Sequence, residues 1–147
     1  MLDSLTLQET NREVTQLITE LLAAWNAHDV DRAAALYAPD YQGLDIGEAM
    51  PQQGPDGLRQ SLGRYLRAFP DLYFILDETV VQDDRVVLAW TACGTHRGRL
   101  MNIPPTGREI VLHGVTLLNV TDGKISRASY IWDVAGLLRG LGLLPEL

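Results

Sequence analysis

The segments GTHRG at residues 94–98 and IPPTGR at residues 103–108 lie between two stretches with a strand pattern, one ending near His96 and the next beginning near Glu109. A connection of about ten residues that contains several glycines and prolines predicts a long hairpin with a structured crossing loop. Such a loop is longer than a hairpin requires, and loops of this kind often carry function. Two interpretations of His96 are therefore open, a functional histidine or a solvated histidine in a turn-rich connection.

The strand pattern extends on both sides of this loop. Apolar residues alternate with a period of two over residues 73–82, 85–96, 109–121 and 124–133, which predicts four successive strands. The dipeptides Asp83-Asp84 and Asp122-Gly123 separate the outer pairs and predict tight hairpin turns.

Before residue 70 the apolar residues recur at three- and four-residue steps. This period predicts helices over residues 8–27, 30–37 and 55–69. A short strand is predicted over residues 41–46, and a last short helix follows the strands over residues 134–139. Helices followed by a run of antiparallel strands predict an α+β fold. We expect a cone-shaped, curved antiparallel sheet wrapped around three N-terminal helices, with a pocket at its open mouth.

The composition is that of one globular domain over residues 1–147, with 46% hydrophobic and 21% charged residues. The net charge of −7 argues against binding nucleic acid or a membrane surface. The spacing of Cys and His residues predicts no metal site, and no glycine-rich motif predicts a phosphate-bearing cofactor. A single cysteine, with no leader and no apolar run of membrane-spanning length, predicts a cytoplasmic protein.

Several short motifs together resemble one family. They are WNAHD at 25–29, LYAPDY at 36–41, FPD at 69–71, the two loop segments quoted above, DGKI at 122–125, WD at 132–133 and GLL at 136–138. With these residues the chain resembles the SnoaL-like polyketide cyclase (ester cyclase) family of the nuclear-transport-factor-2-like, cystatin-like fold. The resemblance implies intramolecular carbon–carbon ring closure of a polyketide ester without cofactor or metal. It also implies homo-oligomers that pair through the outer face of the sheet. A homodimer through that face is predicted separately by the small or apolar residues expected on it, which are Val87, Ala89, Thr91, Val111, Val115 and Leu117.

Asp133 matches the aspartate that serves as general acid/base in the family. A carboxylate at the mouth of an apolar cone would have a raised pKa, which suits removal of an activated α-proton. The alternative is that Asp133 caps the helix that begins at Val134, because aspartate is a favoured N-cap. His96 is the second catalytic candidate, through a hydrogen bond to a substrate carbonyl. Its alternative role is to hold the crossing loop by bonding backbone near Gly98.

Aromatic and apolar side chains are the substrate-binding candidates, although aromatic residues at helical spacing are more often core. These candidates are Trp25, Tyr37, Tyr41, Tyr65, Phe69, Trp90, Met101 and Trp132, with Tyr130 beside them. Asp45 and Tyr41 are weaker polar candidates that we expect on the surface. His113 is expected to point outward from the sheet, and Cys93 to be buried and inert.

Three functions follow from this reading. The first is a cofactor-independent cyclase or isomerase acting on a small hydrophobic or polyketide-like substrate. The second is a related enzyme that opens an epoxide or rearranges a ring, which usually requires more than one carboxylate. The third is a non-catalytic ligand-binding or dimerisation module. It is favoured by Leu44, Leu118 and Ser129 at positions where the family carries polar or aromatic pocket groups.

Overall fold

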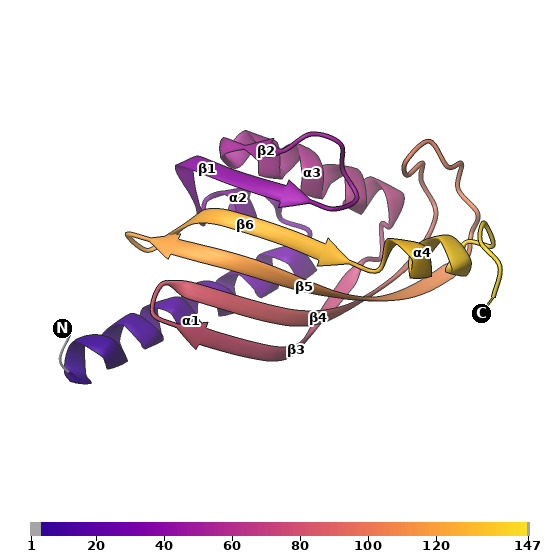
Figure 1. The fold of residues 1–147 in the computed structure, drawn as a ribbon. Coiled ribbons are helices and arrows are strands. Elements are labelled where there is room, and N and C mark those ends of the chain that lie inside the picture. The colour runs from indigo at the N-terminus through magenta and orange to yellow at the C-terminus, as the bar shows by residue number, and fades with distance from the viewer. Residues whose placement is uncertain (1–3, 147) are drawn as a thin grey trace.

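The computed structural model describes residues 4–146, apart from the side chain of Leu7. A single curved sheet carries helices on one face (Figure 1). The helices on that face are α1 (Ser4–Asn26), α2 (Val30–Ala34) and α3 (Gly54–Ala68), and α4 (Val134–Gly140) follows the last strand. The strands are β1 (Tyr37–Asp45), β2 (Gln52–Gln53), β3 (Tyr73–Gln82), β4 (Arg85–Thr95), β5 (Glu109–Thr121) and β6 (Lys124–Trp132). The predicted α+β architecture is confirmed.

The helices form where the apolar period predicted them. The stripe of α1 is buried against the sheet, and its members Val14, Leu17, Ile18, Leu21 and Trp25 are at most 7% exposed. Asp29 caps α2 by accepting a 3.0 Å hydrogen bond from the Arg32 N–H. Among the described helices none is long and apolar enough to cross a membrane.

The prediction that the second helix reaches residue 37 is wrong. The helix ends at Ala34, and Leu36 accepts a 2.9 Å hydrogen bond from the Ile125 N–H at the start of β6. Tertiary pairing with a strand some 90 residues away thus overrides local helix propensity.

The sheet has the order β2-β1-β6-β5-β4-β3, and its pairs are antiparallel except for β1 and β6, which run parallel. The four long strands are confirmed to within one residue at each end. Both predicted hairpin turns form, with positive φ at Asp83, Asp122 and Gly123. The two-residue strand β2, which the sequence pattern did not predict, pairs Gln52 with Gly43 at the edge of the sheet.

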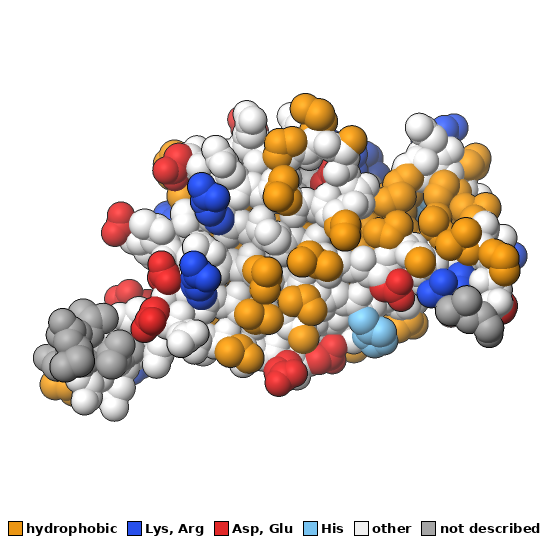
Figure 2. Space-filling model, viewed as in Figure 1, with side chains coloured by type: hydrophobic (Ala, Val, Ile, Leu, Met, Phe, Trp, Pro, Cys, Tyr) orange, Lys and Arg blue, Asp and Glu red, His pale blue; other side chains and the backbone are white. Residues whose placement is uncertain are grey.

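The two faces of the sheet differ in what covers them. On β4 and β5 the even-numbered residues face the helices and form the core with Val86, Leu88, Trp90, Ile110, Leu112 and Leu118. The odd-numbered residues form the outer face, where Val111 is 64% and Leu117 41% exposed. Figure 2 shows hydrophobic side chains gathered across this part of the surface. An outer sheet face that meets water is usually polar, so this face is unusually apolar.

The crossing loop, residues 96–108, turns back on itself and packs against the end of α3. A bridge joins Leu100 to Ile103, with positive φ at the two residues between them. The N–H groups of Arg97 and Gly98 both donate to the Ala68 carbonyl, at 2.9 and 3.1 Å. A Cβ atom at Gly98 would collide with the Arg67 carbonyl, so only glycine permits this approach.

His96 lies at the base of the crossing loop and is fully buried. Its Nδ1 accepts a 3.2 Å hydrogen bond from the Thr106 N–H and lies 3.1 Å from Thr106 Oγ1. The imidazole packs at a tilt on Phe69, with ring centroids 5.6 Å apart. The interpretation of a solvated histidine is therefore wrong, and the geometry is that of a side chain that holds the loop together.

Burial of His96 predicts a pH-dependent stability. Burial lowers the pKa of His96 below its ordinary value of 6.5, with a smaller opposing contribution from the backbone at Gly98. Because the unfolded chain binds this proton more readily, the free energy of unfolding should fall as the pH drops below about 6.5, by at most about 1.4 kcal/mol per pH unit. Urea denaturation between pH 5 and pH 8 measures this slope.

The matched variants separate His96 from the other titrating groups. The His96→Asn variant keeps an acceptor for the Thr106 N–H and should flatten the slope between pH 5 and 7. The His113→Gln variant changes an exposed histidine and should leave it unchanged. An equal flattening in both variants would contradict the assignment to His96.

The start of α4 predicts a second stability effect. Asp133 Oδ1 accepts a 2.8 Å hydrogen bond from the Gly136 N–H, so this side chain is the N-cap of α4. Asp133→Ala should lower the free energy of unfolding by about 1 kcal/mol, whereas Asp133→Asn should leave it nearly unchanged because asparagine caps equally well. Thermal or urea unfolding at pH 7 compares the two, and equal losses in both variants would rule out a capping role.

Candidate active site

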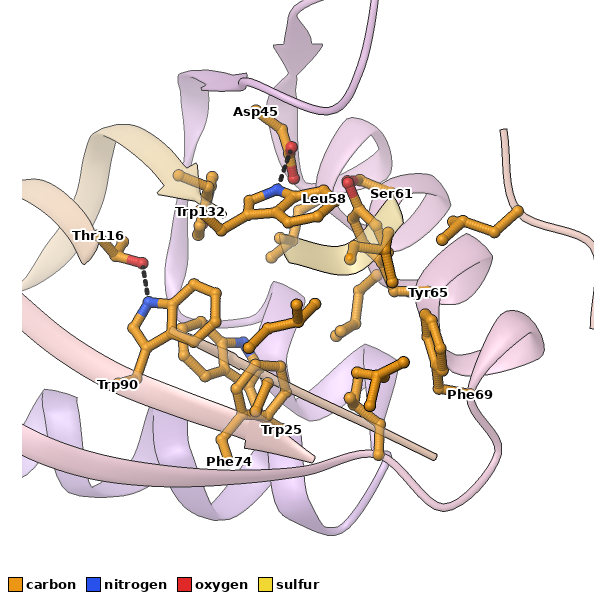
Figure 3. A pocket seen from close by; sticks show the side chains of 18 of the residues that line it. Trp25, Asp45, Leu58, Ser61, Tyr65, Phe69, Phe74, Trp90, Thr116 and Trp132 are labelled. Carbon is orange, nitrogen blue, oxygen red and sulfur yellow. Dashed lines mark hydrogen bonds between the residues drawn. The ribbon is translucent and has the colours of Figure 1, made fainter. Parts of the chain in front are cut away.

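A cavity of about 100 Å³ lies between the inner face of the sheet and helices α1 and α3. Five of the predicted aromatic residues line it, from α1, α3, β4 and β6 (Figure 3). They are Trp25, Tyr65, Phe69, Trp90 and Trp132, and Tyr130 lines it as well. Most of the remaining wall is aliphatic: Leu58, Leu62, Leu72, Ala92, Leu100, Ile110, Leu112 and Leu137. The prediction of an aromatic-rich apolar pocket is met by these residues.

Asp45 at the end of β1 is the one acidic side chain among the described residues that line this cavity. Its expected surface position is wrong, because the residue is only 9% exposed. On β1 the odd-numbered residues Tyr41, Gly43 and Asp45 face inward, where α3 packs against the strand, and β6 pairs beside it in parallel. Sequence alone did not reveal that partner strand.

Two N–H groups hold the Asp45 carboxylate. Oδ1 accepts a 2.9 Å hydrogen bond from Trp132 Nε1 and a 2.8 Å hydrogen bond from the Gly47 N–H. Burial raises the pKa of Asp45 above its ordinary value, and these hydrogen bonds, which stabilise the charged form, oppose the rise. Both bonds end on Oδ1, and the Tyr65 side chain lies near the same carboxylate and also favours its charged form.

Tyr65 faces Asp45 across the end of the cavity. Its ring meets the Trp132 ring edge to face, with centroids 6.1 Å apart and an interplanar angle of 88°. The buried hydroxyl lies near Asp45 and Trp132 but forms no hydrogen bond of normal geometry with a described residue. Burial, followed by the negative charges of Asp45 and Glu48, raises the pKa of this hydroxyl. Tyr65 is therefore a neutral hydrogen-bond donor at any physiological pH.

A chain of hydrogen bonds leads from the cavity wall to the surface. Gln52 accepts from the Tyr41 hydroxyl at 2.7 Å and donates to Ser61 at 2.9 Å. Ser61 in turn contacts Glu48, which pairs with Arg64 on α3. These bonds fix the loop of residues 46–51 to α3, next to the residue that carries the cavity carboxylate.

Tyr37 and Tyr41, two of the predicted substrate-binding residues, do not line the cavity. Both are buried behind it, at 2% and 1% exposure, so the expected surface position of Tyr41 is also wrong. The Tyr37 hydroxyl lies 2.7 Å from that of Tyr130, and the Tyr41 hydroxyl 3.5 Å from it. Their hydroxyl groups thus support Tyr130 from the core side.

Three other predicted residues lie outside the cavity wall. Asp133 is exposed at the N-cap of α4, so its predicted desolvated position at the cavity mouth is wrong. Strand alternation directs its side chain to the opposite face from Trp132, which lines the cavity. His96 is buried beneath the crossing loop and does not line the cavity. Met101 is 39% exposed in that loop, with its Cε close to Gly47. The predicted pair of Asp133 and His96 is not brought together in the cavity.

The three family positions that favoured a non-catalytic module also lie elsewhere. Leu44 is 62% exposed, and Ser129 is half-buried beside it in the β1–β6 pairing. Leu118 is fully buried in the core. None of these three residues lines the cavity. Their positions therefore do not support the prediction that they weigh against catalysis.

Gln52, Ser61 and Thr116 are polar lining residues that sequence reasoning missed. Thr116 accepts a 2.8 Å hydrogen bond from Trp90 Nε1, so it satisfies a buried indole. The alternation of β5 could have placed Thr116 inward with Leu112 and Leu118, whereas nothing in the local pattern marks Gln52.

Two further predictions concern the outer face. His113 is exposed there, as predicted, and its Nδ1 lies 3.1 Å from Thr91 Oγ1, which donates a 2.6 Å hydrogen bond to Asp77. Cys93 is a free thiol that is only half-buried, so the prediction of a buried cysteine is wrong; its odd-numbered position directs it to the outer face of β4. Within residues 4–146 no group of three or more His, Cys, Asp or Glu side chains is arranged to hold a metal ion.

Comparisons with known proteins agree with this architecture. Nogalonic acid methyl ester cyclase from Streptomyces nogalater is 30% identical over 124 residues, which cover 83% of this chain and 92% of that protein. AclR from Streptomyces galilaeus, a proposed hydroxylase, is 30% identical, and its crystal structure superposes with a TM-score of 0.81 over 94% of this chain and 85% of AclR. A protein of ketosteroid isomerase-like fold from Catenulispora acidiphila, 16% identical, shares the fold with a TM-score of 0.74 over 87% of this chain and 93% of its own.

The family model described as SnoaL-like polyketide cyclase matches residues 15–141, which include every strand, helices α2, α3 and most of α1, and the whole cavity wall. The chain therefore belongs to the SnoaL-like polyketide cyclase family.

Proposed function

We propose that this protein closes a carbon–carbon ring in a neutral polyketide ester or ketone by an intramolecular aldol reaction, with Asp45 as general acid/base. The observation that carries the proposal is a carboxylate with a burial-raised pKa in a cavity whose wall is otherwise apolar or neutral. A general base works best when its pKa lies near the working pH, and desolvation moves an aspartate in that direction. The family relationship supports the reaction class.

The proposed reaction balances without an external reagent. Asp45 Oδ2 takes a proton from a carbon next to a carbonyl, and the electron pair of the broken C–H bond forms an enolate. The enolate carbon attacks a second carbonyl of the same molecule, and a new C–C bond forms. The resulting alkoxide then takes the proton back from Asp45, so the product is an isomer of the substrate. No oxidation state changes overall, and for that reason we propose that the reaction is cofactor-independent.

The size of the cavity limits how much of the substrate reacts inside it. Ligand pockets usually enclose about 300–1,000 Å³, whereas this one encloses about 100 Å³. We infer that one reacting ring enters and that the rest of a polyketide lies toward the mouth. We propose that Met101 of the crossing loop, whose Cε lies close to Gly47, is an apolar contact for that outer part of the substrate.

Two alternative functions remain as rivals to test. Epoxide opening with a positioned water usually requires more than one carboxylate, and Asp45 is the one carboxylate among the described lining residues. A non-catalytic module for a small hydrophobic ligand is favoured by the predominantly apolar wall. Loss of turnover on neutralising Asp45 separates the cyclase from this module.

We further propose that the protein is a homodimer through the outer face of the sheet. That face carries the exposed apolar residues Val111, Leu117 and Ile131 on neighbouring strands. A contiguous apolar surface of this kind marks an interaction site, and the closed symmetry of homodimers makes self-pairing the simplest occupant. With a net charge of −7 we propose no nucleic-acid or membrane partner.

Neutralising Asp45 tests the proposed reaction. With nogalonic acid methyl ester as substrate, Asp45→Asn should lower kcat by roughly 10²- to 10⁴-fold, the usual effect of losing a positioned proton-transfer group. Liquid chromatography with mass detection should show a product of unchanged mass in the wild type. Because burial raises the pKa of Asp45, kcat/KM should also fall as the pH drops through a value above 3.8.

Asp133→Asn is the matched control, because it makes the same chemical change at a carboxylate outside the cavity. Its kcat should stay within about twofold of the wild-type value, since asparagine keeps the cap. Dialysis of the wild-type protein against a chelator should leave turnover unchanged, because the proposed reaction needs no metal ion. Loss of turnover in Asp133→Asn alone would restore the sequence-based assignment and remove Asp45 from the mechanism.

The dimer proposal predicts a mass twice that of the chain in light scattering at micromolar concentration. Val111→Lys and Leu117→Lys should each shift the protein toward the monomer, because a buried unpaired ammonium at the interface is costly. Leu5→Lys, which changes a 71% exposed leucine on α1, should leave the dimer intact. A wild-type monomer under these conditions contradicts the proposal.

A further inference from the structure

We propose that Tyr65 is a second catalytic residue, whose hydroxyl donates a hydrogen bond to the carbonyl oxygen of a neutral substrate while the acidic C–H of that substrate faces Asp45 Oδ2. This inference rests on the proposed ring closure, adds a residue to it and gives a physical reason for a neutral substrate. The substrate class is a ketone or ester with an activated C–H bond, as opposed to a free carboxylic acid.

The first observation is that the Tyr65 hydroxyl is buried beside Asp45 and Trp132, close enough for these groups to shift its pKa, yet it forms no hydrogen bond of normal geometry with any described residue. Buried polar groups almost always form hydrogen bonds, and those that do not call for an explanation such as a catalytic role. The other tyrosine hydroxyls next to the cavity are satisfied, because Tyr37, Tyr41 and Tyr130 bond to one another or to Gln52. Tyr65 therefore differs from three neighbours of the same chemical type.

The second observation is the direction of the side chain. Figure 3 shows Tyr65 reaching from α3 toward the part of the cavity where Asp45 and Trp132 lie. The edge-to-face contact with Trp132 fixes the phenol ring, and the same indole donates to Asp45. One tryptophan thus orients both the proposed donor and the proposed base. Such prior positioning is what electrostatic stabilisation of a transition state requires.

The third observation concerns the charge of the lining residues. Donor and acceptor lie on one side of the cavity, Tyr65 supplying an O–H and Asp45 the lone pairs of Oδ2. No Lys or Arg is among the described residues that line the cavity. A substrate carboxylate there would be desolvated, unpaired and repelled by Asp45, which is strongly unfavourable. A carbonyl oxygen meets no such penalty, and the negative charge that develops on it as the enolate forms strengthens the bond from Tyr65.

The hydroxyl keeps its proton throughout this step. Asp45 takes the proton from carbon, the C–H electron pair moves onto the carbonyl oxygen, and Tyr65 stabilises that oxygen by its O–H without transferring the hydrogen. Burial and the nearby carboxylates raise the pKa of Tyr65, which keeps the phenol in its donor form.

Binding of small aromatic probes tests Tyr65 without knowledge of the natural substrate. The probes are 4-fluorophenol, whose oxygen can accept the Tyr65 hydrogen bond and whose O–H can reach Asp45, and fluorobenzene, which can do neither. Fluorine NMR titration gives both affinities. The wild type should bind 4-fluorophenol more tightly, and Tyr65→Phe should reduce this preference by about five- to tenfold, the effect of one neutral hydrogen bond.

Tyr37→Phe is the matched control, because it deletes a buried tyrosine hydroxyl that bonds to Tyr130 and does not line the cavity. It should leave the preference for 4-fluorophenol unchanged even if it lowers stability. With nogalonic acid methyl ester, Tyr65→Phe should lower kcat more than it raises KM, since the hydrogen bond strengthens in the transition state.

The outcomes separate this inference from the proposed function. The role of Tyr65 is overturned if the wild type shows no preference for 4-fluorophenol, or if Tyr65→Phe keeps it. That result leaves ring closure by Asp45 intact as long as Asp45→Asn abolishes turnover. Conversely, a lost preference in Tyr65→Phe together with full turnover in Asp45→Asn would support the binding role of Tyr65 and overturn the cyclase mechanism.

Discussion

The two hydrogen bonds between Asp71 and Thr95 set the geometry on which the rest of the structure depends. Thr95 donates through its N–H and its hydroxyl, both at 2.7 Å, to the two carboxylate oxygens of Asp71. These charge-assisted bonds join the segment after α3 to the end of β4, and they lower the pKa of Asp71 because they stabilise its charged form. The end of β4 is thereby fixed against the helix layer, and the crossing loop begins from a defined point.

The motifs that identify the family are therefore largely structural. Phe69 packs on His96, Ala68 accepts from the crossing loop, and Gly98 allows the close approach. These contacts bring Leu100 and Ile110 into the cavity wall. The polar groups that could do chemistry include Asp45 on β1 and Tyr65 on α3, which lie outside these motifs, and Trp132 on β6, which belongs to one of them. A chain can keep the contacts that build the fold while the residues of its site change, because one fold can host many different functions.

Sequence predicted the parts of the fold that depend on local pattern. The change from helical to two-residue periodicity after residue 70 located the long strands, and Asp122-Gly123 located a hairpin. Local pattern failed where a distant segment decides the outcome. Tyr37 joined a strand because β6 pairs with it, and Asp45 is buried because the indole of Trp132, 87 residues away, covers and bonds it. Asp133 was misplaced for a related reason, since the register shift in β6 changes which residues face inward.

The loop that carries Gly47 and Glu48 explains how one carboxylate can stay desolvated beside a second acidic residue. Glu48 lies close enough to raise the pKa of Asp45, yet Arg64 and Ser61 on α3 pair with it and draw its charge toward the surface. Without that pairing a second, unpaired negative charge would lie near Asp45 and would raise its pKa further. Pairing Glu48 with α3 therefore ties the loop next to the proposed base, Asp45, to the same helix that carries the proposed donor, Tyr65.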